Sequence, residues 1–182
     1  MTRRLPRSQP TWTDVKAKLA TVDRAGLIGL IQDLYAAHND NRTFLHTRFG
    51  LGGDLLKPYK EKLERWLWPD VLRNQDISVA KAKQAISSYR KAVGEPAGLA
   101  ELMVSFCESA VGFSNDVGYQ DEGYFDALVN MFEPALKVIC QLPASDRDTL
   151  IARLDRVRTM SHNLGYGVGD DMDSLLVDYT GN

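Results

Sequence analysis

Apolar and polar residues alternate with a helical period over almost the whole chain. Apolar residues recur three or four positions apart, and residues at that spacing share one face of an α-helix. The pattern first occurs at Trp12, Val15 and Leu19, and a second run starts at Leu27 and Ile28. No segment shows the strict two-residue alternation of a half-buried strand. The sequence therefore predicts an all-α protein.

Capping residues, glycines and prolines divide this pattern into eight or nine helices. Asp23 and Ser78 are suited to cap helix N-termini, and Gly94 and Gly118 are suited to end helices. The connections between the helices are short, which favours antiparallel hairpins packed as a compact bundle or a short solenoid-like array. Pro134 lies inside an apolar run, so we expect a kink there or two shorter helices.

The C-terminal part contains a capping signal and a glycine-rich segment. Ser145 and Asp148 fit a capping box at the start of a helix. The segment 165–171 carries three glycines, but no strand precedes it and its paired aspartates would repel phosphate. We interpret it as a helix stop followed by a short final helix, not as a phosphate loop.

The expected core lies in the middle of the chain. Phe106 and Phe132 belong to opposed apolar stripes, so both should be buried in one core. Cys107 and Cys140 are the only cysteines and both lie in apolar patterns. Two buried thiols are therefore expected, with a bridge between them left open.

Length and composition predict one helical domain over residues 11–182, preceded by a basic mobile arm at residues 1–10. The arm contains Arg3, Arg4 and Arg7. No apolar run approaches the roughly 20 residues of a membrane span, and the basic start leads into no apolar segment of a signal peptide. We therefore expect a cytosolic protein without a membrane partner.

Charge is distributed unevenly along the chain. Residues 1–100 carry 17 Lys and Arg against 10 Asp and Glu, whereas residues 101–182 carry 5 against 14. No Lys or Arg occurs between Lys91 and Lys137. Such asymmetry can orient an anionic partner or a second copy of the chain. Glu101 and Glu108, seven residues apart on one predicted helix, are candidates for a protein-binding face.

The basic half also predicts a candidate nucleic-acid surface, because lysines and arginines cluster on two consecutive predicted helices. An ordinary solvated face stays open as the alternative, since lysines and glutamates four residues apart pair on such helices. The candidate residues are Lys57, Lys60, Arg65, Lys81, Lys83, Arg90 and Lys91.

Three stretches of the chain resemble an uncharacterised bacterial family of small helical proteins, a domain of unknown function. They are residues 14–16 with 27–28 and 33–35, the segment SVAKAKQAI at 78–86, and the segment GYQDEGYF at 118–125. The resemblance covers roughly residues 12–142. It implies an all-helical domain and supplies no catalytic residue.

The histidines bear on two kinds of chemistry, a metal site and RNA cleavage. His38, His46 and His162 are too few and too scattered to build a zinc site with cysteines that lie in apolar stripes, so we predict no metal and no cofactor. Arg156 and His162 resemble the ribonuclease motif of higher-eukaryote-and-prokaryote nucleotide-binding helical bundles, although Val157 stands where a polar residue is usual. A general base and an electrophilic arginine would suit RNA cleavage.

The sequence thus favours a non-catalytic helical interaction protein that acts through protein–protein contacts, with self-association as one form of them. The first alternative is an accessory protein that binds nucleic acid through the basic half. The second alternative is a helical ribonuclease centred on Arg156 and His162.

Overall fold

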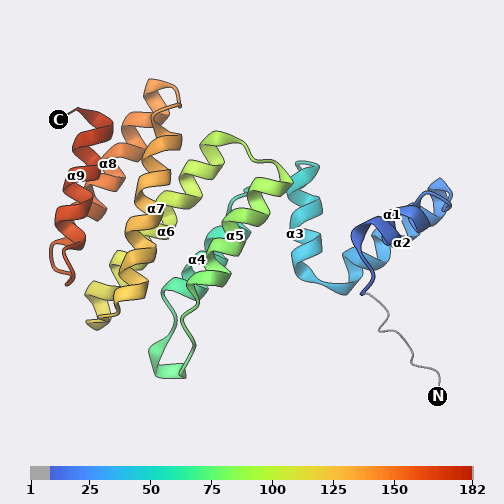
Figure 1. Ribbon diagram of the computed structural model, residues 1–182, viewed down its shortest axis with the longest axis horizontal. Helices are drawn as coiled ribbons and strands as arrows, with labels where there is room; N and C mark the ends of the chain where they lie inside the picture. Colours follow the sequence, from blue (N-terminus) through green and yellow to red (C-terminus); the bar gives the residue numbers. More distant parts are fainter. Residues whose placement is uncertain (1–8, 182) are drawn as a thin grey trace, which may run out of the picture. The chain divides into compact units, whose positions relative to one another are not determined.

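A computed structural model of the chain describes residues 9–181. Within these residues it contains nine α-helices, one short 3-10 helix and no strand, so the all-α prediction is confirmed (Figure 1). Arg3, Arg4 and Arg7 of the predicted basic arm lie outside the described residues. The chain divides into two compact units, residues 1–45 and 46–182.

The nine α-helices take up most of the described chain. Their bounds are α1 (Trp12–Leu19), α2 (Arg24–Ala37), α3 (Asn39–Arg48), α4 (Lys57–Leu67), α5 (Val79–Ala92), α6 (Pro96–Val117), α7 (Glu122–Ile139), α8 (Ala144–Ser161) and α9 (Val168–Thr180). The 3-10 helix, η1 (Val71–Arg73), lies in the loop between α4 and α5. The boundary between the two units falls inside α3.

In the first unit, side chains form hydrogen bonds at both ends of α2. Asp23 is the N-cap of α2, as expected, and its Oδ1 accepts a hydrogen bond from the backbone N–H of Gly26 (2.8 Å). At the other end of α2, Asn41 donates to the carbonyl of Leu34 (2.6 Å) and Arg42 donates to the carbonyl of Tyr35 (3.1 Å). The side chains of Asn41 and Arg42 thus satisfy carbonyls in the last turn of α2, which have no partner within the helix.

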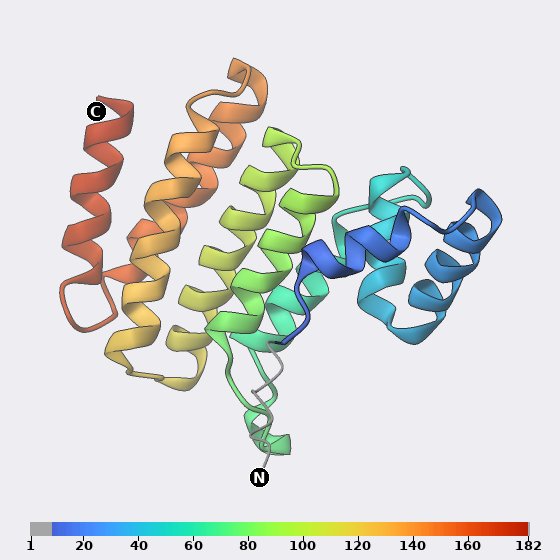
Figure 2. The ribbon, with the colours of Figure 1, turned by 45° about the vertical axis from the view of Figure 1, so that its right-hand side comes forward.

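The second unit stacks three antiparallel hairpins, α4–α5, α6–α7 and α8–α9. Helices α4, α6 and α8 contact one another in sequence, and α7 contacts α9 alongside them. Figures 1 and 2 show α4 to α9 side by side with alternating directions. This order corresponds to the short solenoid-like array among the two arrangements that the sequence left open.

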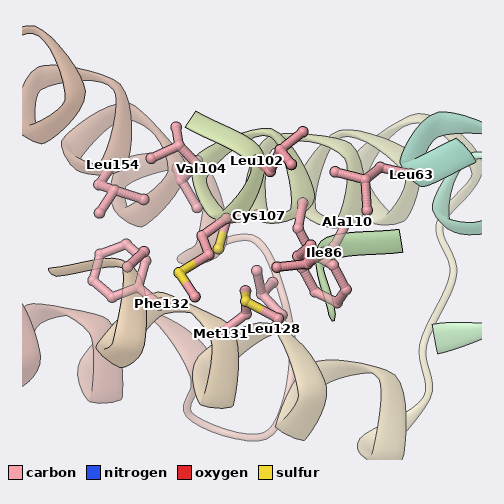
Figure 3. Close-up of a cluster of buried hydrophobic side chains, with 14 of the residues drawn as sticks. Leu63, Ile86, Leu102, Val104, Cys107, Ala110, Leu128, Met131, Phe132 and Leu154 are labelled. Carbon is pink, nitrogen blue, oxygen red and sulfur yellow. The ribbon is translucent and has the colours of Figure 1, made fainter. Parts of the chain in front are cut away.

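The core of the second unit lies around α6, which is packed between α4, α7 and α8. Phe106 and Phe132 are 1% and 0% exposed and belong to the same core, as expected. Figure 3 shows side chains of this cluster, among them Cys107, Phe132 and Leu154. Cys107 is buried and its burial raises the pKa of the thiol. Cys140 is exposed, which corrects the expectation of two buried thiols, and neither cysteine is bridged.

Most predicted helix ends are confirmed, the N-cap of α8 is wrong, and one of the two alternatives at Pro134 is excluded. Ser78 caps α5 through the N–H of Lys81, and Gly118 ends α6 at a φ of 66°. Helix α7 continues through Pro134 as one helix, not two shorter ones. The N-cap of α8 is Pro143, so Ser145 lies inside the first turn and is not a cap.

Candidate interaction surfaces

The first two helices leave their apolar side chains in solvent. Neither α1 nor α2 contains a buried residue. The exposed fraction ranges from 37% for Tyr35 to 69% for Trp12. The large apolar side chains concerned are Trp12, Val15, Ile28, Leu30, Ile31, Leu34 and Tyr35, together with Val22 in the turn between the two helices. The stripes that the sequence predicts are present, and within the first unit they stay largely exposed.

Helix α2 carries two apolar seams side by side. Leu27, Leu30 and Leu34 follow the spacing i, i+3 and i+7. Ile28, Ile31 and Tyr35 follow the same spacing one residue later. Each series matches the a and d positions of a helix–helix contact, and a helix with two such series is suited to contact two neighbours in a bundle.

Two of the cations predicted on α4 lie beside carboxylates of the same chain. Lys60 makes an ion pair with Glu101 (2.5 Å) and Lys57 lies 4.0 Å from Glu61. Both ammonium groups thus face carboxylates. They are poorly placed to neutralise phosphates.

Two other predicted cations lie over the same aromatic ring. The Nζ of Lys81 lies 3.8 Å from the centroid of the Trp66 ring, and the Cζ of Arg65 lies 4.4 Å from it. Arg65 also donates a hydrogen bond to the carbonyl of Asp76 (3.3 Å). These contacts join the end of α4 to the beginning of α5 by cation–π interactions.

The remaining predicted cations are Lys83, Arg90 and Lys91 on α5. All three are exposed, and their side chains have no ion-pair partner among the described residues. Lys83 and Arg90 are seven residues apart, so they share one face of the helix. This pair is the part of the predicted nucleic-acid surface that is open to a ligand.

Glu101 and Glu108 lie in an ion cluster inside the second unit. Arg153 of α8 donates to Glu101 (2.5 Å) and, through two nitrogens, to both oxygens of Glu108 (2.8 and 2.7 Å). Their side chains are 21% and 40% exposed. The sequence pattern did not reveal Arg153, because a single arginine on a helix gives no signal of a contact 45 residues away. The two glutamates therefore connect α6 to α8.

This cluster controls the ionisation of Glu101. Burial on its own would raise the pKa of Glu101, but hydrogen bonds from Arg153 and Lys60 hold that pKa below its ordinary value. The hydrogen bonds that Arg153 donates to Glu108, opposed by burial, raise the pKa of Arg153 above its ordinary value. Glu101 and Arg153 thus stay ionised at neutral pH.

The histidine of the ribonuclease hypothesis has a different arginine beside it. The Nε2 of His162 lies 3.3 Å from Oδ1 of Asp173, and Arg158 donates to the same oxygen (2.6 Å). In the described part of the chain, no hydrogen bond or ion pair joins Arg156 to His162. The hydrogen bond from Arg158 lowers the pKa of Asp173.

Asp170 lies close enough to His162 and Asp173 for the three to approach one metal ion, with their ligand atoms within 4.8 Å of one another. The guanidinium of Arg158 already occupies the Asp173 oxygen, and its positive charge would oppose a cation there. The cluster is therefore explained as the connection between α8 and α9.

A groove of about 680 Å³ runs between α8 and α9. Ile151, Ala152 and Leu176 line it together with Asp155 and Arg158. Because Arg158 pairs with Asp155 at this rim, the groove presents no unpaired arginine to a ligand.

In the part of the chain that the structure describes, no helix has the length and apolar character needed to span a membrane.

Comparisons with protein-family models, with curated proteins and with solved structures each give no match. The resemblance to an uncharacterised bacterial family stays a prediction. The function must accordingly be inferred from the surfaces of this chain itself.

Proposed function

We propose that this protein is a non-catalytic helical interaction protein that binds another protein chain through the apolar faces of α1 and α2. The observation that carries the proposal is that these helices bury no residue although both have strong apolar stripes. Exposed apolar patches of this kind mark interaction sites. The cytosol stays the predicted compartment.

The length of the two helices supports the proposal. Helix α1 has 8 residues and α2 has 14. Isolated helices shorter than about 12–15 residues are marginal in water, and most helices in proteins are stabilised by packing of an apolar face. Burial of one side chain such as Ile31 contributes about 1.5–3 kcal/mol. A partner chain would supply the packing that both helices need.

The test is an affinity capture from the native host with matched variants of the full chain. Ile31→Asp places a charge in the centre of the α2 face. Leu72→Asp places the same charge on a side chain that is 92% exposed in η1, which belongs to the second unit. We expect one identified chain to be captured by the wild type and by Leu72→Asp, and lost with Ile31→Asp.

The captured chain is then purified and titrated against the same three proteins by calorimetry. Direct binding that Ile31→Asp weakens and Leu72→Asp leaves unchanged supports the proposal. The proposal is wrong if every captured chain, a second copy of this one included, binds Ile31→Asp as well as the wild type.

A second candidate function is nucleic-acid binding by α4 and α5. The favouring observation is that Arg65 and Lys81 both lie over the ring of Trp66, next to a helix that carries the unpaired cations Lys83 and Arg90. A guanidinium stacked on a ring keeps its N–H edge available for phosphate. This candidate is tested by the salt dependence of binding, which is taken up in the Discussion.

A further inference from the structure

The groove between α8 and α9 continues along α8 into a second hollow. This hollow measures about 580 Å³ and shares Asp148, Ile151 and Thr180 with the groove of about 680 Å³. On α8 the combined lining runs from Arg147 to Arg158, which corresponds to about 16 Å or three helical turns. We call the two hollows together the α8–α9 groove. Figures 1 and 2 show its two helices side by side at one end of the array.

We propose that the α8–α9 groove binds an amphipathic helix of another protein, which carries lysines or arginines beside its apolar face. Every residue that lines the groove belongs to the second unit, so the shape of the groove is set within that unit. The site is separate from the apolar faces of α1 and α2 and adds a second contact to the proposed function.

Apolar side chains of both helices line the groove. Ile151 and Ala152 come from α8, and Leu176 and Val177 come from α9. Ala152 is exposed, and Val177 is 53% exposed although it lies in a helix that packs against α8. A helix laid along the groove would bury these side chains against its own apolar face, which is how grooves on helical proteins bind helical peptides.

The charges of the groove favour a basic partner. Its lining contains three carboxylates and two guanidinium groups, and Arg158 is shared between Asp155 and Asp173. Asp148 is 74% exposed and lies 3.3 Å from its sequence neighbour Arg147. Because such exposed pairs contribute little, Asp148 can accept a cation from a partner. Residues 101–182 add a wider acidic surface, with 14 Asp and Glu against 5 Lys and Arg, which attracts a basic chain.

The walls of the groove select a helix over an extended peptide. An extended peptide gains affinity by adding a strand to the edge of a sheet. The backbone groups of α8 and α9 are paired within each helix, so they leave an extended peptide without such partners. A helix pairs its own backbone and can pack on α8 and α9 as a third helix. Asp148 and Asp155 are seven residues apart, so the bound helix should carry cations at about that spacing.

The first unit of the chain does not offer this charge pattern. Lys16 and Lys18 of α1 are two residues apart and therefore point to different sides of the helix. The charged residues of α2 are one cation, Arg24, and one anion, Asp33. Arg42 of α3 already donates to carbonyls of α2. The pattern thus favours a different protein as the occupant, and occupation by the first unit becomes an outcome of the test.

The experiment is a titration of the full chain with two labelled synthetic peptides, followed by fluorescence anisotropy. Both peptides are helical and carry leucines at positions i, i+3 and i+7. The first has lysines seven residues apart on each side of the leucines, and the second has glutamates at the same positions. We expect the lysine peptide to bind and the glutamate peptide to bind on the order of tenfold more weakly, because like charges then meet in the groove.

Val177→Arg and Ala152→Arg each place a long cation in the groove, one from α9 and one from α8. Both should weaken binding of the lysine peptide by on the order of tenfold or more, because apolar contact is lost and like charges meet. Val93→Arg is the matched control, since Val93 is 46% exposed at the end of α5 and does not line the groove. This control should bind the lysine peptide like the wild type.

The carboxylate is tested by Asp148→Asn, which should weaken the lysine peptide by up to about fivefold, the effect of one exposed ion pair. Asp178→Asn is its control, because Asp178 is exposed on α9 and does not line the groove. Circular dichroism and thermal unfolding of each variant show whether α9 remains folded. Ala152→Arg tests the groove from α8 even if Val177→Arg disturbs α9.

Three results would overturn the proposal. The first is a wild type that does not bind the lysine peptide, as when the first unit of the chain occupies the groove. The second is equal binding of the lysine and glutamate peptides. The third is a set of groove variants that bind the lysine peptide as well as Val93→Arg does. None of these results bears on capture through α1 and α2, so the proposed function is judged separately.

Discussion

Arg153 is the residue that most changes the interpretation of Glu101 and Glu108, the candidates for a protein-binding face. Its guanidinium binds Glu101 and Glu108 on α6 from a position on α8. Reversal of both glutamates to lysine would therefore place four positive side chains, the two new lysines with Lys60 and Arg153, in one partly buried cluster. A loss of association in such a variant could not be assigned to a surface contact, because the second unit itself would be destabilised.

Arg153→Ala should lower the free energy of unfolding by about 1–3 kcal/mol, because it leaves the partly buried Glu108 without its donor and Glu101 with Lys60 alone. Arg156→Ala is the matched control, since Arg156 lies on the same helix and is exposed. Urea unfolding followed by fluorescence of Trp66 and Trp68 measures the difference. Equal midpoints for the two variants would show that the cluster does not stabilise the second unit.

Glu101 should make stability depend on pH in acid. Its pKa in the folded protein is below the ordinary value of 4.5, so its contribution is fully present above pH 4.5 and is lost as the pH falls through the lower folded pKa. The midpoint temperature of thermal unfolding should thus fall more steeply below pH 4.5 for the wild type than for Glu101→Gln. Glu122→Gln, a change at an exposed carboxylate, is the control and should keep the wild-type slope.

At the scale of elements, the helical period predicted where helices lie but not which neighbours they have. The apolar spacing of α2 resembles that of α5, yet α5 has five buried residues and α2 has none. A one-dimensional pattern records which face is apolar. Whether that face is covered depends on contacts with distant segments, or with another chain, that the pattern does not contain.

The continuity of α7 at Pro134 and the wrong prediction of the α8 N-cap have local physical reasons. Pro134 removes one backbone donor, but α7 buries nine residues on both sides of it, and that packing outweighs the roughly 3 kcal/mol cost of an interior proline. At α8, Pro143 has a φ of −55°, which suits the start of a helix. The helix accordingly begins before Ser145, and the serine side chain reaches Asp146 instead (3.3 Å).

Phe106 and Phe132 test the packing of α6 against α7. Replacing either by alanine should lower the free energy of unfolding by about 3–5 kcal/mol, because both side chains are fully buried. Phe49→Ala is the control, as Phe49 is 67% exposed, and it should change stability by less than about 0.5 kcal/mol. Chemical denaturation gives the three values. Unchanged stability in both core variants would contradict the common core.

At the scale of the whole molecule, the uneven charge predicted from sequence divides into paired and unpaired groups. Lys60, Glu101 and Glu108 form internal contacts and are no longer candidates for an open surface of their own. Lys83 and Arg90 stay open. Sequence alone could not make this division, because it depends on side chains such as Arg153 that approach only after α6 and α8 have packed.

Nucleic-acid binding through the unpaired cations predicts a measurable dependence of affinity on salt. If Lys83 and Arg90 neutralise phosphates, binding should weaken steeply as salt increases, because counterions are released on binding. Lys83→Ala with Arg90→Ala should then reduce the logarithmic salt slope by roughly 0.7–0.9 for each cation removed. Alanine preserves α5, since it is the best helix former.

The matched control removes two other cations, Lys16→Ala with Lys18→Ala on α1, and should leave the slope unchanged. Fluorescence anisotropy with labelled single- and double-stranded oligonucleotides measures each slope over a salt series. A wild type that does not bind at low salt, or two double variants with the same slope, would contradict a phosphate site on α5. The protein-binding role of α1 and α2 would then be the function that the described surfaces still support, because the apolar faces do not depend on those cations.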